Sequence, residues 1–220
     1  MNNAVLLQLA GTSEYLKLMT LYFDRHVEYC ERHDFDYIVQ GGPVAHWAEP
    51  PWIGWAKIAM MQQLMLQGYE YLVYLDADAY ISDLSVDLRS VCQKPINMVR
   101  WWDQSESLSH LQGGVIYMHS LPPQAQQANA YTIVSTLLQE AKYYIDRFPG
   151  LRGWYEQGQI NEFSKHDWFK DFFGEVPIEY NWGEKANKKC EHPVVKAFHG
   201  VRPMNVLYET MKESIDNEYE

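Results

Sequence analysis

The sequence predicts an α/β fold, a single domain in which helices flank a mixed, mainly parallel central sheet. The first observation is alternation, because strand-like apolar runs and segments of helical periodicity follow one another through residues 4–75. This order is typical of a parallel sheet whose strands are joined by helices. The second observation is size: 220 residues, of which 47% are hydrophobic, suit one packed core and exclude a disordered chain.

Each element of the first part has its own signal. Residues 13–33 carry apolar side chains at helical spacing, and Thr12 or Ser13 can cap that helix. The loop at 41–52 is rich in Gly, Pro and Trp, and Gly68 ends the helix that follows it. The elements expected here are strand 4–11, helix 13–33, strand 35–40, helix 54–69 and strand 71–75.

The second part continues with further strands and helices. Pro122-Pro123 precede a long helical pattern, and proline favours the start of a helix. The polar, amphipathic tail at 209–220 predicts a solvated terminal helix or a frayed end. No repeat, low-complexity segment or flexible linker divides the chain. The elements expected here are strands 96–102, 113–120, 175–182 and 194–200, and helices 124–148 and 156–166.

Charge and cysteine content exclude several classes of protein. Lys and Arg number 18 against 29 Asp and Glu, so the net charge of −11 gives no basic surface for a nucleic-acid polymer. Cys30, Cys92 and Cys190 are far apart and form no CxxC, which indicates a reducing compartment. The first residues lack a signal peptide's basic lead, and no segment reaches the roughly 18 apolar residues of a membrane span. We therefore expect a cytoplasmic protein with no membrane span.

The strand at 71–75 runs directly into Asp76-Ala-Asp78, the clearest chemical signal in the sequence. A buried parallel strand opens at its carboxyl end onto the crevice where α/β sheets bind ligands. Two carboxylates there, with no cation beside them in sequence, repel each other, so a divalent cation is the first candidate partner. The alternative is a group of helix-capping carboxylates, because Asp83 and Asp87 lie nearby.

With its surroundings, this motif resembles the metal-binding Asp-x-Asp of nucleotide-sugar glycosyltransferases with the single-domain, Rossmann-like fold called GT-A. Within that group the chain is similar to the retaining α-galactosyl and α-mannosyl transferases, and it also resembles the soluble glycosyltransferase domains that large algal DNA viruses encode for their capsids. Asp-x-Asp alone is weak, but the matching segments span nearly the whole chain. They are "LLQLAGTSEYLKL" (6–18), "WAKIAMMQQLM" (55–65), "GGVIYMHS" (113–120), "WYEQGQINEF" (154–163) and "FHGVRPMN" (198–205).

The resemblance implies a metal site formed by Asp76, Asp78 and His199, with Mn²⁺ or Mg²⁺ as its cofactor. Oxygen ligands suit both ions, and a mixed Asp and His set favours Mn²⁺. His199 follows an apolar strand and precedes Gly200, so a turn can bring its imidazole to the edge of the sheet. Because the chain contains eight histidines, a hydrogen-bonded core histidine is the alternative.

The resemblance also places Glu156 and Gln157 at the reaction centre, as the catalytic residues. In such enzymes the glutamine lies near the anomeric carbon of the donor, and the acidic residue contacts the donor sugar or the acceptor. The alternative is structural, because acidic residues in the first turn of a helix interact favourably with its dipole. No clear pair of carboxylates of the glycosidase type accompanies them.

A wider set of residues is expected around the nucleotide sugar. Tyr15 would stack on the base, Lys57 and Arg202 would hold phosphate or donor, and the two glycines before residue 115 would let the backbone approach the sugar. Two departures from the family pattern affect the diphosphate contact: Arg202 replaces a Lys, and 204–205 replaces a Trp. Lys57 has a surface position on its helix as an alternative. The full donor set is Leu9, Ala10, Gly11, Tyr15, Lys57, Asp76, Asp103, Gly113, Gly114 and Arg202.

Aromatic side chains are candidates for stacking on an acceptor sugar, although each of them also suits a packed core. The chain has 8 Trp and 16 Tyr residues, which is many for this length. The candidates are Trp52, Trp55, Trp101, Trp102 and Trp182.

The function expected is therefore metal-dependent transfer of a hexose or deoxyhexose from a nucleoside-diphosphate sugar to a glycan or glycoprotein, with retention. A UDP-sugar is the favoured donor. The resemblance also implies one glycosyltransferase domain over 1–220, divided into a nucleotide-binding half to about residue 95 and a donor-sugar and acceptor half from about residue 96. The alternatives are a haloacid-dehalogenase-type phosphatase, a sugar nucleotidyltransferase and a non-catalytic sugar-binding module.

Overall fold

The computed structural model describes residues 3–41, 53–103, 108–120, 129–147, 155–183 and 190–218. The helices are α1 (Ser13–Met19), α2 (Phe23–His33), α3 (Ile53–Leu66), α4 (Ala130–Arg147), α5 (Tyr155–Lys165) and α6 (Met204–Asp216). The strands are β1 (Ala4–Ala10), β2 (Phe35–Gly41), β3 (Tyr71–Asp76), β4 (Ala79–Ile81), β5 (Ile96–Asp103), β6 (Leu108–Leu111), β7 (Val115–His119), β8 (Phe173–Val176) and β9 (Val195–Ala197). Short 3-10 helices are η2 (Leu88–Val91), η3 (Lys170–Phe172) and η4 (Ile178–Asn181).

The large sheet has the strand order β2-β1-β3-β7-β5-β6, and β8 pairs with β5. β1 runs parallel to β2 and β3, with helices in the connections between them. β7 runs antiparallel to β3 and β5, whereas β8 runs parallel to β5. The sheet is therefore parallel in its first part and mixed in its second. The α/β fold with a mixed sheet and flanking helices, expected from the sequence, is confirmed.

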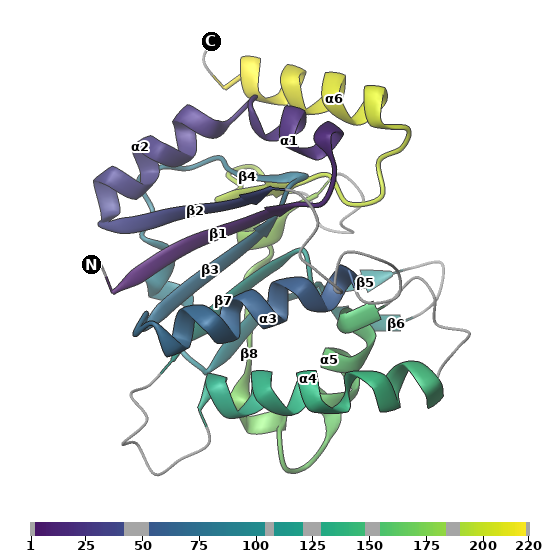
Figure 1. Ribbon diagram of the computed structural model, residues 1–220. Coiled ribbons are helices and arrows are strands. Elements are labelled where there is room, and N and C mark those ends of the chain that lie inside the picture. The colour runs from purple at the N-terminus through teal and green to yellow at the C-terminus, as the bar shows by residue number, and fades with distance from the viewer. Residues whose placement is uncertain are drawn as a thin grey trace.

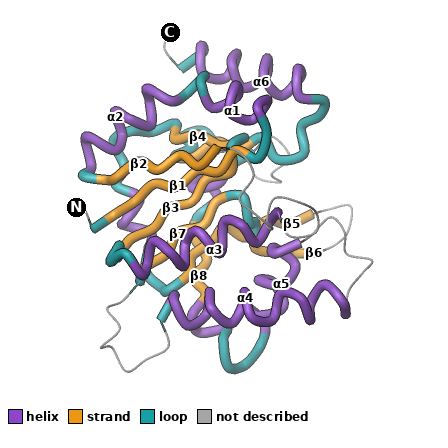
Figure 2. The backbone as a smooth tube through the Cα atoms, viewed as in Figure 1, coloured by secondary structure: helices purple, strands orange, loops and turns teal. Residues whose placement is uncertain are grey.

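Helices cover both faces of this sheet. Figure 1 shows α1, α2 and α6 on one face and α3, α4 and α5 on the other, and the tube in Figure 2 shows the strands as a layer between them. On the first face, Leu18 of α1 and Leu207 of α6 are fully buried in one apolar cluster. On the second, Ile58 of α3 and Ile133 of α4 are buried in another. The α6 helix thus packs the end of the chain against its beginning.

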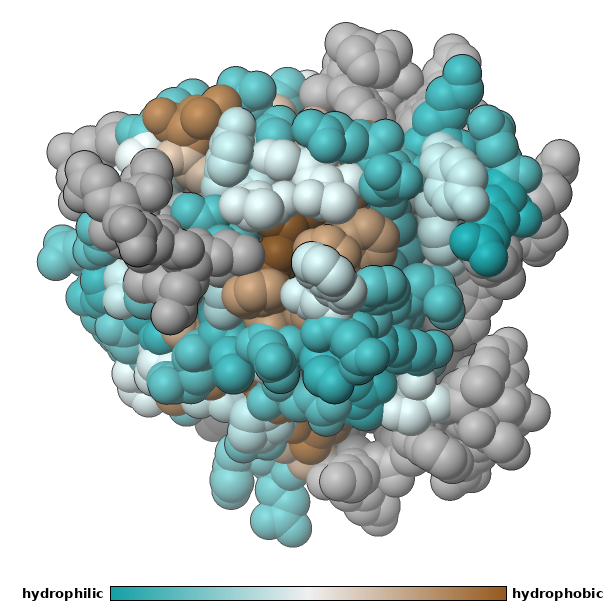
Figure 3. Space-filling view, turned by 90° about the horizontal axis from the view of Figure 1, so that it is seen from below, coloured by the Kyte–Doolittle hydropathy of each residue, from teal (hydrophilic) through white to brown (hydrophobic). Residues whose placement is uncertain are grey.

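The second helix layer is polar where it meets water. Figure 3 views the molecule from below Figure 1, on the side of α4, and shows mostly hydrophilic side chains around a smaller hydrophobic area. Among the described residues, Trp168 is the most exposed large hydrophobic side chain at 80%. No helix in the described ranges is long and apolar enough to cross a membrane.

A small second sheet positions the turn after β3. β4 pairs antiparallel with β9, and the backbone N–H of Phe198 donates to the carbonyl of Asp78 at 2.8 Å. The N–H of Asp76 donates to the carbonyl of Gly114 at 2.7 Å, which ties the end of β3 to the start of β7. The turn that carries the two aspartates is therefore held between β7 on one side and the residue before His199 on the other.

Several elements differ from the sequence-based expectation. The helix expected over 13–33 is two helices, because the chain turns where the Thr20 hydroxyl donates to the carbonyl of Lys17 at 2.6 Å, in competition with helical bonding. The strand expected over 175–182 ends at Val176, since Pro177 has no N–H to donate and a 3-10 turn begins there. β4 and β6, with 3 and 4 residues, were not predicted because they are too short for an alternating pattern to stand out. The tail does form a helix, α6, which begins earlier than expected.

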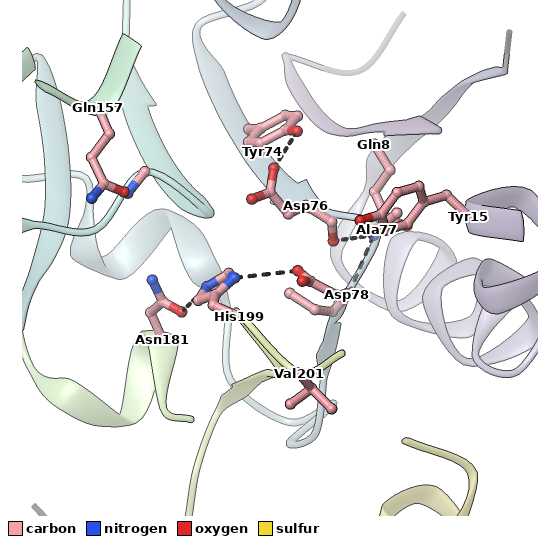
Figure 4. Close-up of polar contacts among 12 residues, drawn as sticks. Gln8, Tyr15, Tyr74, Asp76, Ala77, Asp78, Gln157, Asn181, His199 and Val201 are labelled. Carbon is pink, nitrogen blue, oxygen red and sulfur yellow. Dashed lines mark hydrogen bonds and ion pairs between the residues drawn. The ribbon is translucent and has the colours of Figure 1, made fainter. Parts of the chain in front are cut away.

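A buried amide supports the carboxyl end of β3 from below. The side chain of Gln8 is fully buried in β1, and its Nε2 donates to the carbonyls of Asp76 at 3.4 Å and Ala79 at 3.3 Å. The hydroxyl of Tyr22 donates to the carbonyl of Ala77 at 2.8 Å. Three backbone carbonyls of the aspartate turn are therefore held by side chains from β1 and the start of α2. Figure 4 shows the Gln8 side chain next to Ala77 in this turn.

His26 continues this network in a neutral form. Its Nε2 accepts the backbone N–H of Ile81 at 3.0 Å, and its Nδ1 lies 3.0 Å from Oε1 of Gln8, so the ring proton is on Nδ1. The Tyr37 hydroxyl donates to the same Gln8 oxygen at 2.6 Å. Complete burial, with a smaller contribution from Arg25, lowers the pKa of His26 from 6.5 to about 3. A second proton on the ring would break its bond to Ile81.

Acid should therefore destabilise the fold through His26. Because the folded pKa lies below the ordinary value of 6.5, the unfolded chain binds the proton more readily. Above pH 6.5, His26 causes no loss of stability, because the ring is neutral in both the folded and the unfolded chain. As pH drops from 6.5 towards 3, the free energy of unfolding falls by up to about 1.4 kcal/mol per pH unit. We expect His26→Gln to be less stable than wild type at pH 7.5 but to lose less stability between pH 6.5 and 5.

Urea unfolding at several pH values measures this difference. His33→Gln, on the same helix but in a less buried position, controls for the loss of a histidine from α2. Equal slopes for wild type and His26→Gln would contradict the prediction.

Candidate active site

Three side chains that can bind a metal meet beyond the carboxyl end of β3. Asp76 ends β3, Asp78 lies in the turn to β4, and His199 follows β9. Each offers one ligand atom, and these atoms all lie within 4.8 Å of one another. Figure 4 shows the His199 ring pointing at Asp78, with Asp76 beside them. The structure therefore brings together the metal-binding set expected from the sequence.

The chemistry of this cluster fits a cation. Oδ1 of Asp78 is buried without a hydrogen bond, although Nδ1 of His199 lies 3.2 Å from it. Burial raises the pKa of Asp78, but His199, followed by Arg202, outweighs burial, so the pKa falls below its usual value and the carboxylate stays charged. A buried, charged carboxylate oxygen with no hydrogen bond is an atom that a divalent ion would satisfy.

The charge of His199 responds to the same neighbours. Burial lowers its pKa, but the Asp78 carboxylate and, to a smaller extent, Asp76 together raise it, so the net shift in the pKa of His199 is upward. The raised pKa of His199 favours a proton on Nδ1, the nitrogen that faces Asp78. A bound cation would replace that proton, because a metal ligand must be a neutral imidazole.

The carboxylate of Asp76 is held by a neighbour on its own strand. The hydroxyl of Tyr74 donates to Oδ1 of Asp76 at 2.6 Å. The Asp76 side chain is 35% exposed, whereas that of Asp78 is 9% exposed. Asp76 therefore reaches towards the open side of the site and Asp78 faces inward.

Lys57 occupies a buried position between the two parts of the site. Its ammonium lies 2.7 Å from Oε1 of Glu156, 2.8 Å from the carbonyl of Gly113 and 3.5 Å from Oδ1 of Asp76. Burial lowers the pKa of Lys57, but Asp76 and Glu156 raise it to about 12, so the ammonium is charged. Because its three donors face three protein oxygens, Lys57 links Asp76 to the start of α5 in this conformation. The surface position considered as its alternative is wrong, and its contact with phosphate stays a prediction.

The first turn of α5 places Glu156 and Gln157 beside the start of β7. Glu156 is 7% exposed and pairs with Lys57. Oε1 of Gln157 accepts the N–H of Gly113 at 2.8 Å. Asn161, one turn later, bonds both the N–H and the carbonyl of Leu111 through its amide. The α5 helix is thus hydrogen-bonded to the end of β6 and to the loop that leads into β7. Figure 4 labels Gln157.

The structure explains why residue 114 is a glycine, and the reason differs from the close approach of a sugar that we expected. A Cβ atom built on Gly114 would lie 2.0 Å from Cε1 of His199, so the imidazole occupies the space that a side chain would need. At Gly113, a Cβ would lie 3.3 Å from Gln157, a contact that a small shift relieves. The absent side chain of Gly114 therefore makes room for the imidazole of His199, and the expected approach of a sugar to these glycines stays a prediction.

The residues expected around the nucleotide lie along the end of β1 and the start of α1. Ala10 is 1% exposed and packs in the core, whereas Gly11 is exposed. The Arg202 guanidinium donates to the hydroxyl of Tyr15 at 3.1 Å, so the segment after β9 meets α1 here. The half-buried Leu9 packs against the core on the opposite face of the sheet. The side chain of Asp103 lies outside the described part of the chain.

The tryptophans expected to bind an acceptor sugar divide into different environments. Trp55 is 1% exposed, and its Nε1 donates to Oε1 of Gln159 at 2.7 Å, so it is a core residue and its assignment as an acceptor platform is wrong. Trp101 lies against His199, with ring centroids 5.6 Å apart. Trp182 is half-buried beside β9. Trp52 and the side chain of Trp102 lie outside the described residues.

A family match accompanies this geometry. Residues 4–128 match the galactosyl transferase GMA12/MNN10 family. The chain belongs to this family. It is therefore a glycosyltransferase, and the phosphatase, nucleotidyltransferase and non-catalytic alternatives are wrong. No curated protein sequence matches the chain.

Solved structures share the GT-A fold of this glycosyltransferase. A glycosyltransferase involved in glycosylation of the major capsid of PBCV-1 is 15% identical, with a TM-score of 0.65 over 97% of this chain and 98% of that one. The galactosyltransferase LgtC, solved with donor and acceptor sugar analogues, is 9% identical, with a TM-score of 0.60 over 97% and 95%. GlyE of Streptococcus pneumoniae TIGR4 is 13% identical, with a TM-score of 0.56 over 100% and 63%. At these identities the likeness shows the fold.

Sequence reasoning missed the polar side chains that hold the site. Asn181 lies 3.2 Å from His199, Tyr74 binds Asp76, and Gln8 supports the turn between the aspartates. Only Gln8 carried a usable signal, since it is a polar residue inside an otherwise apolar buried strand. Asn181 and Tyr74 act through contacts that depend on the fold.

The two glycines before β7 provide a matched test. We expect Gly114→Ala to weaken Mn²⁺ binding by tenfold or more, because the new methyl group overlaps the His199 ring and displaces a metal ligand. Gly113→Ala should weaken it far less, since its methyl group would lie 3.3 Å from Gln157 and 3.5 Å from Oε1 of Glu156 and would not meet His199. Titration of each folded variant with Mn²⁺, followed by electron paramagnetic resonance, compares them. Similar affinities for both variants would contradict this account of Gly114.

Proposed function

We propose that this glycosyltransferase is metal-dependent and moves a hexose or deoxyhexose from a nucleoside-diphosphate sugar, with UDP favoured, to a glycan or glycoprotein acceptor with retention. The observation that carries the proposal is the convergence of Asp76, Asp78 and His199, whose ligand atoms lie within 4.8 Å of one another. The family match supports sugar transfer. The GT-A fold supports a nucleotide-sugar donor.

Asp76, Asp78 and His199 would hold Mn²⁺ or Mg²⁺ at the end of β3. The ion would supply positive charge to the diphosphate of the donor and to the leaving nucleoside diphosphate. Asp78, the buried ligand, contributes a carboxylate that its neighbours keep charged. Asp76 is more exposed, and its position suits the donor side of the ion.

The nucleoside would lie beyond the end of β1, against the start of α1. Leu9, Ala10 and Gly11 provide backbone at this edge, and the half-buried Tyr15 offers its ring to the base. Arg202 is exposed and already reaches Tyr15, so its guanidinium lies on the side where the phosphates would pass. A bidentate guanidinium is well suited to phosphate oxygens.

Charge pairing at α5 favours a front-face path for the transfer. The Glu156 carboxylate is paired with the buried Lys57 at 2.7 Å, so one of its oxygens is already engaged in an ion pair. The acceptor hydroxyl would then attack the anomeric carbon on the face from which the diphosphate leaves, and its proton would pass to a phosphate oxygen. The new carbon–oxygen bond replaces the broken one with the same anomeric configuration. Gln157, one residue on, would contact the sugar at this centre.

A cytoplasmic location is part of the proposal. Cys30, Cys92 and Cys190 are all free thiols. Burial raises the pKa of Cys30 and of Cys92 to about 12, so neither is a reactive thiolate near neutral pH. Free, unpaired cysteines suit a reducing compartment.

The proposed metal site predicts how the substitution Asp78→Ala changes nucleotide binding. We expect wild type to bind UDP more tightly with Mn²⁺ than without it, and more tightly than ADP or GDP. Asp78→Ala should remove the metal-dependent part while the fold survives, because the buried ligand is lost. Thermal shift and calorimetry measure this; a ligand at 100 times its dissociation constant adds about 2.7 kcal/mol of stability.

Two outcomes of that titration would count against the proposal. Unchanged Mn²⁺-dependent binding in folded Asp78→Ala would remove Asp78 from the site. GDP as the tightest nucleotide would redirect the donor towards mannosyl- or fucosyl-type sugars. Asp83→Ala, in the half-buried loop after β4, is the control and should bind UDP as wild type does.

The reaction centre predicts a separation of turnover from affinity. Gln157→Ala should lower kcat by tenfold or more with little change in UDP affinity, because its contact with the sugar strengthens in the transition state. Glu156→Ala should cost at least as much, since it also leaves the buried Lys57 with one partner fewer. Proton NMR of the product from a defined donor reports its configuration. An inverted anomeric centre rejects retention, and wild-type turnover in Gln157→Ala rejects the role of that residue.

A further inference from the structure

The two ring nitrogens of His199 face different partners. Nδ1 points at Asp78, with 3.2 Å between Nδ1 and Oδ1, and belongs to the side where the candidate ligand atoms converge. Nε2 points away from that cluster and lies 3.2 Å from Oδ1 of Asn181. Figure 4 shows the imidazole between these two side chains, with Asn181 on the far side from the aspartates. The ring is therefore held at both ends.

Asn181 is itself fixed by the surrounding backbone. It ends η4 and is fully buried. Its carbonyl accepts the indole N–H of Trp101 at 3.0 Å, and the Trp101 ring also packs against His199. The next residue, Trp182, bonds to β9 in both directions: its N–H donates to Val195 at 2.9 Å and its carbonyl accepts from Ala197 at 2.7 Å. The same short strand therefore sets the positions of Asn181 and of His199.

The amide oxygen of Asn181 determines which nitrogen of His199 carries a proton. A side-chain amide oxygen only accepts hydrogen bonds, so the Nε2 that faces it must carry hydrogen. When Nδ1 gives up its own proton, the neutral ring that remains has its lone pair on Nδ1, directed at the aspartates. Histidine ligands commonly donate their other ring N–H to an acceptor in this way, which fixes both tautomer and orientation.

The amide nitrogen of Asn181 indicates that the contact between Asn181 and His199 does more than fill space. Nδ2 of Asn181 is buried and has no hydrogen-bond partner among the described residues. An unpaired buried donor costs free energy, which an apolar side chain at a fully buried position would avoid. Asn181 thus places an amide oxygen beside Nε2 of His199, although its own amide nitrogen has no partner among the described residues.

We propose that Asn181 is a positioning residue for the metal site, which keeps the proton of His199 on Nε2 and so presents Nδ1 as the third metal ligand. The proposal rests on the proposed metal site. Asn181 touches neither the ion nor the donor, and acts through His199 alone. Its effect should therefore appear in metal affinity even when no sugar nucleotide is present.

The test is the affinity of the full chain for Mn²⁺ alone, measured by electron paramagnetic resonance and repeated with UDP. Asn181→Leu removes the acceptor but keeps a side chain branched at Cγ with the same number of heavy atoms, and we expect 10- to 100-fold weaker Mn²⁺ binding, the usual loss when such a partner is removed. Asn181→Asp keeps an oxygen facing Nε2, and it should bind Mn²⁺ as tightly as wild type or more tightly. His199→Ala gives the loss expected when the ligand itself is absent.

A second measurement does not depend on the stability of any variant. Nitrogen-15 NMR of the histidine rings in the wild-type protein with Mg²⁺ distinguishes the two neutral tautomers. We expect His199 with hydrogen on Nε2, and hydrogen on Nδ1 would overturn the proposal. Wild-type Mn²⁺ affinity in folded Asn181→Leu would also overturn it.

The outcomes separate this inference from the proposed function. If wild type binds Mn²⁺ and Asp78→Ala does not, the metal site stands, and the two Asn181 variants then decide the inference by themselves. If wild type and Asp78→Ala bind Mn²⁺ equally weakly, the metal site is wrong and the role of Asn181 falls with it.

Discussion

The hydrogen bond from the backbone N–H of Phe198 to the carbonyl of Asp78 is the contact on which the rest of the site depends. Asp78 and His199 are 121 residues apart in sequence, and this bond, within the pairing of β4 and β9, brings them together. Both strands have only 3 residues, so their pairing alone gives little stability. Their register is kept by η4 on one side of β9 and by the apolar cluster beneath α6 on the other.

Charge balance imposes the second constraint. Asp76, Asp78 and Glu156 gather in a small volume, and carboxylates this close repel one another unless cations separate them. Lys57 lies between Asp76 and Glu156, where it neutralises the side of the site next to α5. On the other side His199 faces Asp78 directly, and one buried oxygen of that carboxylate has no hydrogen bond within the described part of the chain. The donors of Lys57 therefore all face oxygen atoms, whereas one oxygen of Asp78 has no hydrogen-bond partner among the described residues. This difference is expected of a site that receives an ion beside Asp78.

Support for the aspartate turn comes from deep in the sheet rather than from the surface. Gln8 reaches up from β1 to two carbonyls of the turn, and Tyr22 reaches a third. His26 is held neutral in the same network, because its second nitrogen accepts a backbone N–H of β4. The turn carries its ligands on a platform of fully buried polar groups, which limits how far the carboxylates can move.

The sequence by itself determined the α/β fold, the family and the candidate metal-binding residues Asp76, Asp78 and His199, because these depend on local patterns. Apolar runs and helical periodicity report each element directly, and Asp76-Ala-Asp78 and the segment at 198–205 lie in continuous motifs. It did not determine β4, β6, the break between α1 and α2, or the burial of Trp55. Only the tertiary structure decided that Lys57 is paired with carboxylates, that Gly114 makes room for an imidazole, and that Asn181 holds His199. Each of these contacts joins residues 18 to 99 positions apart, and no local pattern encodes which distant side chain will lie across a sheet edge.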